Sequence, residues 1–280
     1  MRHHNGLIFV CVLTGAIVAS AQAPAPLGPP ANVATLKNYL PLGPPANLPP
    51  SQPADLSGAW VRTGPLQSVS LADVGGALRG KEPDIPYLAW SRAKTLSEIP
   101  PTGPFAQPER TTDPWIRYCE SNGPFRIFMH PGRISFVQMP DKVLILHEVM
   151  QQFRIVRLNS THPPFDDLDP SWWGDSVGWY ENGNTLVVDT IGTNGRTWLS
   201  QQGHPTTVKL HVIERYRRVD PATVAVDVVI DDPGAYERPF QTRISMRQST
   251  VPFMQSPWNC SVRDNTQFTE TMLKDAAVVK

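Results

Sequence analysis

Net charge is the first property that this 280-residue sequence lacks. It holds 25 basic and 25 acidic side chains, so the formal charge is zero. Proteins that bind nucleic acid through phosphate contacts carry a basic excess, and this balance excludes a strongly basic nucleic-acid binder. Charged residues make up only 18% of the chain and hydrophobic residues 40%, which excludes a wholly disordered protein and leaves enough apolar material for a core.

Long hydrophobic runs are also scarce. The one candidate, residues 7–18, is too short to span a bilayer comfortably, and Pro24 follows soon after it. It comes after Arg2 and before Ala21-Gln22-Ala23, which is the order of a secretory signal peptide: a positive start, an apolar stretch and a small-residue cleavage site. We therefore predict a signal peptide at residues 1–23, a periplasmic or extracellular location, and no integral membrane segment after signal removal.

Cysteine is rare, with three residues in the chain. Cys11 lies inside the predicted signal peptide, which leaves Cys119 and Cys260 in the mature protein. An even pair of cysteines in an oxidising compartment favours a disulfide between them, and two separate buried thiols are the alternative. The bond would close a loop of more than a hundred residues, for which chain entropy predicts a stabilisation of about 4–5 kcal/mol.

Proline is present in excess, with 30 residues. Because proline breaks helices and central strands, this content excludes a long helical bundle. Residues 24–54 are rich in Pro and Ala and repeat Leu-Gly-Pro-Pro-Ala-Asn at 27–32 and 42–47. We interpret this stretch as an extended linker or surface strap, and residues 55–280 as a single β-rich domain.

From Phe125 onwards the sequence predicts β-structure, after a short helix at residues 88–96. The strongest hairpin signal is Asn182-Gly183-Asn184, which separates two apolar runs. Successive hairpins of this kind predict an all-β antiparallel meander that closes into a barrel or a sandwich. The predicted strands are residues 57–61, 134–138, 143–148, 152–158, 178–181, 185–190, 208–218, 223–230 and 240–248.

The alternation of side chains along residues 208–218 singles out Glu214. This carboxylate shares a face with the apolar Val212 and Tyr216. An inward-pointing carboxylate must be paired, hydrogen-bonded or protonated, so Glu214 is either a structural ion pair with an arginine or a functional acid. The same alternation places His211 on the opposite face, so these two residues cannot chelate one ion.

Polar and aromatic residues concentrate between His162 and His211. Loops at the mouth of a barrel usually carry the binding groups, and tryptophans there would line a pocket for aromatic rings, lipids or sugars. The alternative is that the tryptophans plug the ends of the barrel. The predicted ligand-binding residues are Trp172, Trp173, Trp179, Trp198, His162 and His211.

Acid–base chemistry would use His204 as the base, with Glu214 or Asp175 as the acid or orienting group. Ser176 lies between two glycines, but its surroundings predict β-hairpins rather than the strand–turn–helix of a lipase-type nucleophile. The sequence has no Cys-x-x-Cys, no His-Glu-x-x-His and no glycine-rich phosphate loop. A metal site would therefore need histidines from loops, and the identity of any cofactor stays open.

Several strings carry a family resemblance. They are WGDSVGWYE at 173–181, NTLVVDTIG at 184–192, LHVIERYRR at 210–218 and DDPGAY at 231–236. From about residue 56 to residue 268 the chain resembles a large group of exported bacterial proteins with a lipocalin-like β-rich domain and no assigned function. The resemblance implies a secreted β-barrel. Members of the group often carry histidines where this chain has Asp175 and Thr206, so any site built on those histidines is altered here.

The function that the sequence favours is an exported protein that binds a small hydrophobic or aromatic molecule in a tryptophan-lined pocket. Two alternatives remain open. One is a hydrolase or lyase that acts on a small substrate, with His204 as base and Glu214 as acid. The other is a structural protein of the cell envelope. The sequence names neither the ligand nor the oligomeric state, and it does not decide whether the protein is an enzyme.

Overall fold

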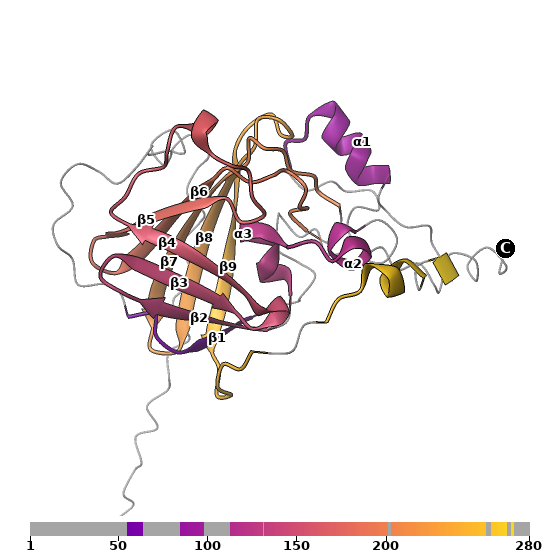
Figure 1. Cartoon of the computed structure of the whole chain (residues 1–280). Coiled ribbons are helices and arrows are strands. Elements are labelled where there is room, and N and C mark those ends of the chain that lie inside the picture. The colour runs from indigo at the N-terminus through magenta and orange to yellow at the C-terminus, as the bar shows by residue number, and fades with distance from the viewer. Residues whose placement is uncertain are drawn as a thin grey trace, which may run out of the picture.

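A computed structural model describes residues 55–63, 85–97, 113–130, 132–200, 203–255, 259–267 and 270–271. The predicted signal peptide and linker lie outside the described residues. The strands form one closed barrel in which β1 to β9 follow one another in sequence order (Figure 1). This confirms the predicted all-β fold, and of the two predicted architectures, barrel and sandwich, the described strands form the barrel.

The strand boundaries agree closely with the hydrophobic alternation of the sequence. The strands are β1 Ala59–Arg62, β2 Arg133–Gln138, β3 Lys142–His147, β4 Gln152–Leu158, β5 Asp175–Glu181, β6 Thr185–Ile191, β7 His211–Asp220, β8 Thr223–Asp231 and β9 Phe240–Gln248. Strand β5 begins three residues earlier than predicted. Strand β7 begins three residues later, because a turn closed by the Leu210 N–H donating to the Thr207 carbonyl (3.1 Å) precedes it.

One strand pair departs from the antiparallel meander. Strands β4 and β5 are parallel, with Val156 opposite Ser176, whereas every other neighbouring pair is antiparallel, including β1 with β9. Parallel neighbours need a connection that returns the chain to the end where it started. Residues 159–174 make this connection, and they carry His162, whose contacts are described below.

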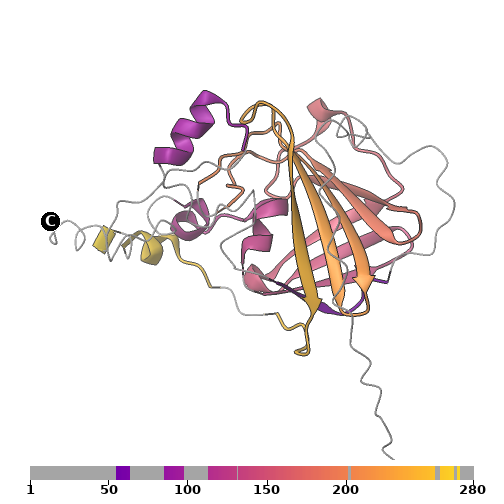
Figure 2. The same cartoon turned by 180° about the vertical axis from the view of Figure 1, so that it is seen from behind.

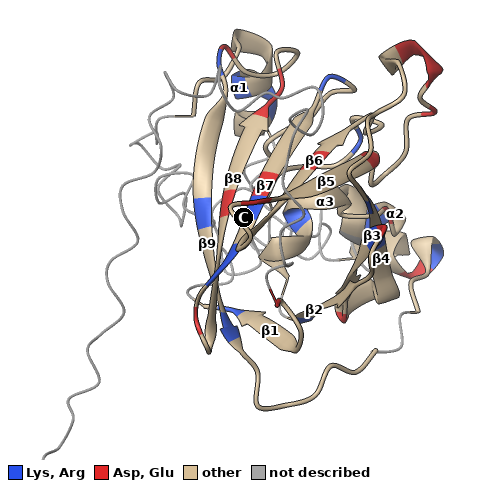
Figure 3. Cartoon of the chain, turned by 90° about the vertical axis from the view of Figure 1, so that its left-hand side faces the viewer, with Lys and Arg blue, Asp and Glu red and all other residues tan. Residues whose placement is uncertain are grey.

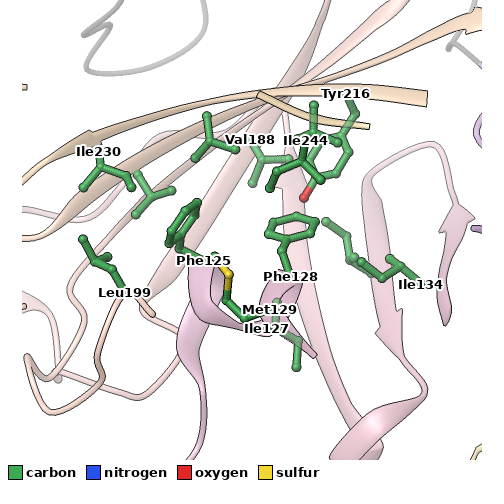
Figure 4. Close-up of a cluster of buried hydrophobic side chains, with 14 of the residues drawn as sticks. Phe125, Ile127, Phe128, Met129, Ile134, Val188, Leu199, Tyr216, Ile230 and Ile244 are labelled. Atoms are coloured by element: carbon green, nitrogen blue, oxygen red, sulfur yellow. The ribbon is translucent and has the colours of Figure 1, made fainter. Parts of the chain in front are cut away.

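The interior of the barrel is filled by a helical plug, which we define as α3 (Gly123–Arg126) and the 3₁₀ turn Ile127–Met129. The prediction of β-structure from Phe125 was wrong here, because a short, mostly apolar run does not distinguish a buried strand from a buried helix. Pro124 lies in the first turn of α3, where its missing N–H is tolerated. Phe125 and Phe128 point from the plug towards the inward-facing side chains of the strands (Figure 4).

Helices α1 (Ala89–Ser97) and α2 (Pro114–Tyr118) lie outside the barrel on one side of it (Figures 1 and 2). The sequence predicted α1 but not α2. The residue after α2, Cys119, forms a disulfide with Cys260, which confirms the predicted pairing. The two cysteines are 141 residues apart, and a loop of that length gives an entropic stabilisation of about 5 kcal/mol.

Charged residues of both signs lie along β7, β8 and β9 (Figure 3). Arg215 pairs with Glu181, and Arg243 on β9 donates to Asp227 on β8. Arg215 also lies directly opposite Asp227 in the register. Cross-strand pairs of opposite charge contribute up to about 1 kcal/mol each and help to fix the register. No helix among the described residues is long and apolar enough to cross a membrane.

Candidate functional site

The candidate site lies on the outer surface of the barrel, where β5, β6 and β7 come together. Asp175 opens β5, Asp189 lies near the end of β6, and His211 opens β7. Their neighbours Thr190 and Val212 face the interior, so the alternation of the strands turns these three polar side chains outward. The antiparallel pairing of β6 with its two neighbours brings the three positions to the same end of the sheet.

Two histidines converge on one carboxylate. The Nε2 atom of His211 lies 2.6 Å from Oδ1 of Asp189, and Nε2 of His162 lies 3.5 Å from the same oxygen. On its other side, Nδ1 of His162 lies 2.6 Å from Oδ2 of Asp175. Nη2 of Arg157 donates to both oxygens of Asp175, at 2.9 and 2.7 Å. We call this row of five side chains the His–Asp chain.

The surroundings of the His–Asp chain shift the pKa values of His162 and Asp189 in favour of their charged forms. Burial alone would lower the pKa of His162, but the hydrogen bond to Asp175, the contact with Asp189 and the charges of both carboxylates outweigh it, and the pKa is raised. Burial alone would raise the pKa of Asp189, but the contacts and charges of the two imidazoles reverse this, and the pKa is lowered. The pair thus stabilises the charged form of each partner, the carboxylate of Asp189 and the imidazolium of His162.

An open cleft of about 750 Å³ runs along the His–Asp chain. His162, Asp189 and His211 form its polar wall. Lys209 also lines the cleft; it is exposed and makes no ion pair within the described part of the chain. The other lining residues are apolar: Pro163, Pro164, Phe165, Ile191, Leu210 and Pro233. An apolar cleft of this size with a few convergent polar groups is typical of small-molecule sites.

The loop between β4 and β5 positions His162. It is tied to the sheet at two places: the Asn159 N–H donates to the Gly178 carbonyl at 2.8 Å, and the Ser171 N–H donates to the Gly192 carbonyl at 3.1 Å. Gly174 returns the loop to β5 with a φ of +66°, and a Cβ atom there would lie 2.3 Å from the Ile191 carbonyl oxygen. Only glycine therefore fits immediately before Asp175.

Glu214, which we predicted as an acid, does not belong to this site. It points into the barrel, where Arg154 donates to both of its oxygens at 2.5 and 2.9 Å and the Tyr216 hydroxyl donates to it at 2.6 Å. This is the buried structural ion pair that the sequence offered as the alternative. Ser176 also faces inward, with its hydroxyl 2.8 Å from that of Thr190.

The structure also separates His204 from Asp175. His204 is fully buried, and its Nδ1 lies 2.6 Å from the hydroxyl oxygen of Tyr87. Burial lowers the pKa of His204 to about 3, so the ring is neutral at physiological pH. Thr206 donates to the Thr197 carbonyl at 2.7 Å and has no part in the His–Asp chain. Of the three residues predicted to be catalytic, Asp175 alone lies in the candidate site.

The four tryptophans predicted to bind ligand have separate settings. The ring contacts are Arg196 over Trp172 (4.9 Å), His147 stacked on Trp173 (5.4 Å) and Arg126 over Trp198 (5.7 Å). Trp179 is fully buried, and Trp173 packs against the hydrophobic core. The cleft beside the His–Asp chain contains none of these rings, whereas both histidines predicted to bind ligand, His162 and His211, line it.

The residues that the sequence analysis missed are Arg157, Asp189 and Lys209. Asp189 and His211 face outward from neighbouring strands, a signal that the alternation of β6 and β7 carried. Arg157 had no such signal, because its approach to Asp175 depends on the parallel pairing of β4 with β5. Among the described residues no group of three or more His, Cys, Asp and Glu side chains could hold a metal ion.

The fold and the site together define a nine-stranded β-barrel protein with a filled interior and an apolar cleft on its outer surface. Comparisons of the sequence with protein-family models and with curated proteins found no match. The chemistry of the site therefore rests on its geometry.

Proposed function

We propose that this protein binds a small molecule in the cleft beside the His–Asp chain. The ligand has an apolar or aromatic body and at least one polar group. The observation that carries the proposal is the convergence of His162 and His211 on the buried Asp189 in the wall of an otherwise apolar cleft. The apolar wall would take up the body of the ligand, while His211, whose Nδ1 is not used in the contact with Asp189, would orient its polar group.

The filled interior supports a site on the outer surface. The plug occupies the part of the barrel where an open lipocalin-like barrel would hold its ligand. The proposal keeps His162 and His211 as ligand contacts and assigns the apolar contacts to Phe165 and its neighbours in the cleft rather than to the tryptophans. The exposed Lys209 adds a cation at the cleft, which would favour ligands that carry a negative charge.

We further propose that the protein works outside the cytoplasm. The support is the signal-peptide pattern of residues 1–23 together with the Cys119–Cys260 disulfide, since disulfides persist in oxidising compartments. The resemblance to exported bacterial proteins agrees with this placement.

A second candidate function is general acid–base catalysis, in a hydrolase or a lyase. The specific support is the 2.6 Å contact of His211 with Asp189, because a carboxylate that orients an imidazole is the arrangement that acid–base enzymes use. This candidate predicts hydrolysis of chromogenic esters with a bell-shaped pH dependence. Retained activity in His211→Gln would eliminate it.

The binding proposal is tested with 8-anilinonaphthalene-1-sulfonate, an aromatic anion whose fluorescence rises in apolar sites. Phe165→Ala removes an exposed ring from the cleft (50% exposed), and Phe153→Ala removes one from the outer face of β4 (57% exposed) as a matched control. We expect Phe165→Ala to weaken binding about tenfold, as the loss of one buried aromatic contact predicts, and Phe153→Ala to leave it unchanged. Equal effects of the two variants, or no binding to the unaltered protein, would refute the proposal.

A further inference from the structure

A second cleft, of about 610 Å³, lies on the outer surface beside β1, β2 and β9. Its floor is a row of three outward-facing residues, since Val61 lies opposite Arg133 on one side and opposite Arg247 on the other. Its lining residues are Val61, Gly132, Arg133, Glu148, Val149, Arg247, Gln248, Ser249, Thr250 and Val251. In contrast to the first cleft, six of its ten lining residues have polar or charged side chains.

The two clefts are far apart. On β8, Thr223 lies opposite Arg247 and Asp231 lies opposite His211. These two positions are eight residues apart along the strand, which corresponds to about 26 Å at 3.3 Å per residue. The second cleft is therefore a separate site, and its properties do not depend on the function proposed for the first.

The second cleft carries a surplus of positive charge. Glu148 is the sole carboxylate among its described lining residues, and it is already engaged: it forms an ion pair with Arg133 and accepts the Arg133 N–H at 3.0 Å. Arg133 Nε also donates to the Ser249 hydroxyl at 3.2 Å, which holds the guanidinium in place. Arg247 is exposed and makes no ion pair with any described residue. A fixed guanidinium and an unpaired one thus flank Val61.

A small inner chamber adjoins this cleft. It has a volume of about 10 Å³, the space of one water molecule, and shares Arg133 and Glu148 with the cleft. His130 and His147 line it, at 6% and 3% exposure, yet Nε2 of His130 and both ring nitrogens of His147 have no hydrogen-bond partner in the described chain. Buried polar groups are rarely left unpaired, so these nitrogens indicate a bound species that completes them.

The chamber does not suit a cation. Arg62 and Arg133 line it together with the two histidines, and the one lining carboxylate is already paired. Burial, with the charges of Arg126 and Arg154 as a smaller cause, lowers the pKa of each histidine to about 3, so both rings are neutral. Neutral imidazoles and guanidinium groups together present mainly N–H donors, which match water and oxyanions.

We propose that the second cleft binds the oxyanion group, a carboxylate or a phosphate, of a small polar ligand between Arg133 and Arg247, above a water molecule held by His130 and His147. Guanidinium groups suit this task because their planar forks form bidentate hydrogen bonds to carboxylates and phosphates. The volume of the cleft exceeds that of a bare anion, and the side chains of Gln248 and Thr250 give the rest of the ligand hydrogen-bonding partners.

Isothermal titration calorimetry with inorganic phosphate, and separately with acetate, tests the proposal at an ionic strength held constant with chloride. Arg247→Gln removes the unpaired guanidinium of the cleft. Arg217→Gln is the matched control, because Arg217 is also exposed on the outer surface but does not line the cleft. We expect Arg247→Gln to weaken binding of the preferred oxyanion about tenfold or more, the value of a charge-assisted hydrogen bond, and Arg217→Gln to leave it unchanged.

The comparison of the two probes identifies the ligand class. Tighter binding of phosphate would indicate a phosphorylated ligand, and tighter binding of acetate a carboxylic acid. Equal weakening by Arg247→Gln and Arg217→Gln would show general attraction of anions and would overturn the proposal. Absence of measurable binding of both probes to the unaltered protein would also overturn it.

Discussion

Lowering the pH from 7.5 to 5 is expected to destabilise the barrel strongly, because three buried histidines stay neutral in the folded state. Burial lowers the pKa values of His130, His147 and His204 to about 3, and for the first two a nearby arginine lowers them further. In the unfolded chain the same groups would protonate near their ordinary value of 6.5. Between these two values the unfolded state binds more protons, so the free energy of unfolding falls as the pH falls.

The magnitude follows from proton linkage. For a group that titrates at 6.5 when unfolded and at about 3 when folded, the move from pH 7.5 to pH 5 costs about 2 kcal/mol. The three histidines together cost about 6 kcal/mol, which is comparable with the whole stability of an ordinary domain. His162 acts in the opposite sense. Because its folded pKa is raised, its contribution is fully present below pH 6.5 and is lost as the pH rises through the folded value.

Urea unfolding at several pH values between 5 and 7.5 measures this dependence. His147→Phe is the informative variant, since both ring nitrogens of His147 lack a hydrogen-bond partner in the described chain and a phenyl ring retains the stacking on Trp173. We expect it to remove about a third of the pH dependence, or about 2 kcal/mol, between these limits. A free energy of unfolding that does not change between pH 7.5 and 5, or an NMR titration of His147 near pH 6.5, would refute the reasoning.

Three further perturbations follow from the structure. Glu214→Gln leaves a buried arginine without its counter-charge and should lower the free energy of unfolding by about 3–5 kcal/mol, measured by chemical denaturation; a loss below about 1 kcal/mol would contradict the assignment. Reduction of the Cys119–Cys260 bond should lower the free energy of unfolding by up to about 5 kcal/mol, and an unchanged melting temperature in reductant would contradict it. Asp189→Asn should lower the pKa of His162, followed by NMR, because the carboxylate raises it; an unchanged titration would show that the two groups are uncoupled.

The strands were predictable because their side chains alternate between the interior and the outer face of the barrel. On β8, Val224, Val226 and Val228 alternate towards the core, and the alternation along β7 placed Glu214 on the apolar face that turns inward, where it lies opposite Val228. The requirement that a buried carboxylate be paired, hydrogen-bonded or protonated then gave an arginine ion pair as one of two alternatives for Glu214, without indicating Arg154 as the partner. Local pattern and elementary electrostatics were sufficient here, because every step concerned neighbouring strands or a single side chain.

The plug and the tryptophans were not predictable in the same way. The run from Phe125 to Met129 is buried along its whole length, Arg126 included, and such a run has no periodicity that distinguishes a helix from a strand. The tryptophans lie close together in the sequence but contact different partners, because alternation along β5 and the path of the loops separate them. Composition identified a region rich in binding residue types and could not say which of them share a cavity.

The candidate site itself originates in the one departure from the meander. A tight hairpin between β4 and β5 would leave no loop to cross the outer surface. The parallel pairing requires a long return, and residues 159–174 supply it, which brings His162 against Asp175 and Asp189 and sets Arg157 beside the start of β5. Sequence spacing could name His162, Asp175 and His211 as candidates, but the partners of each were decided by a crossover that no local pattern specifies.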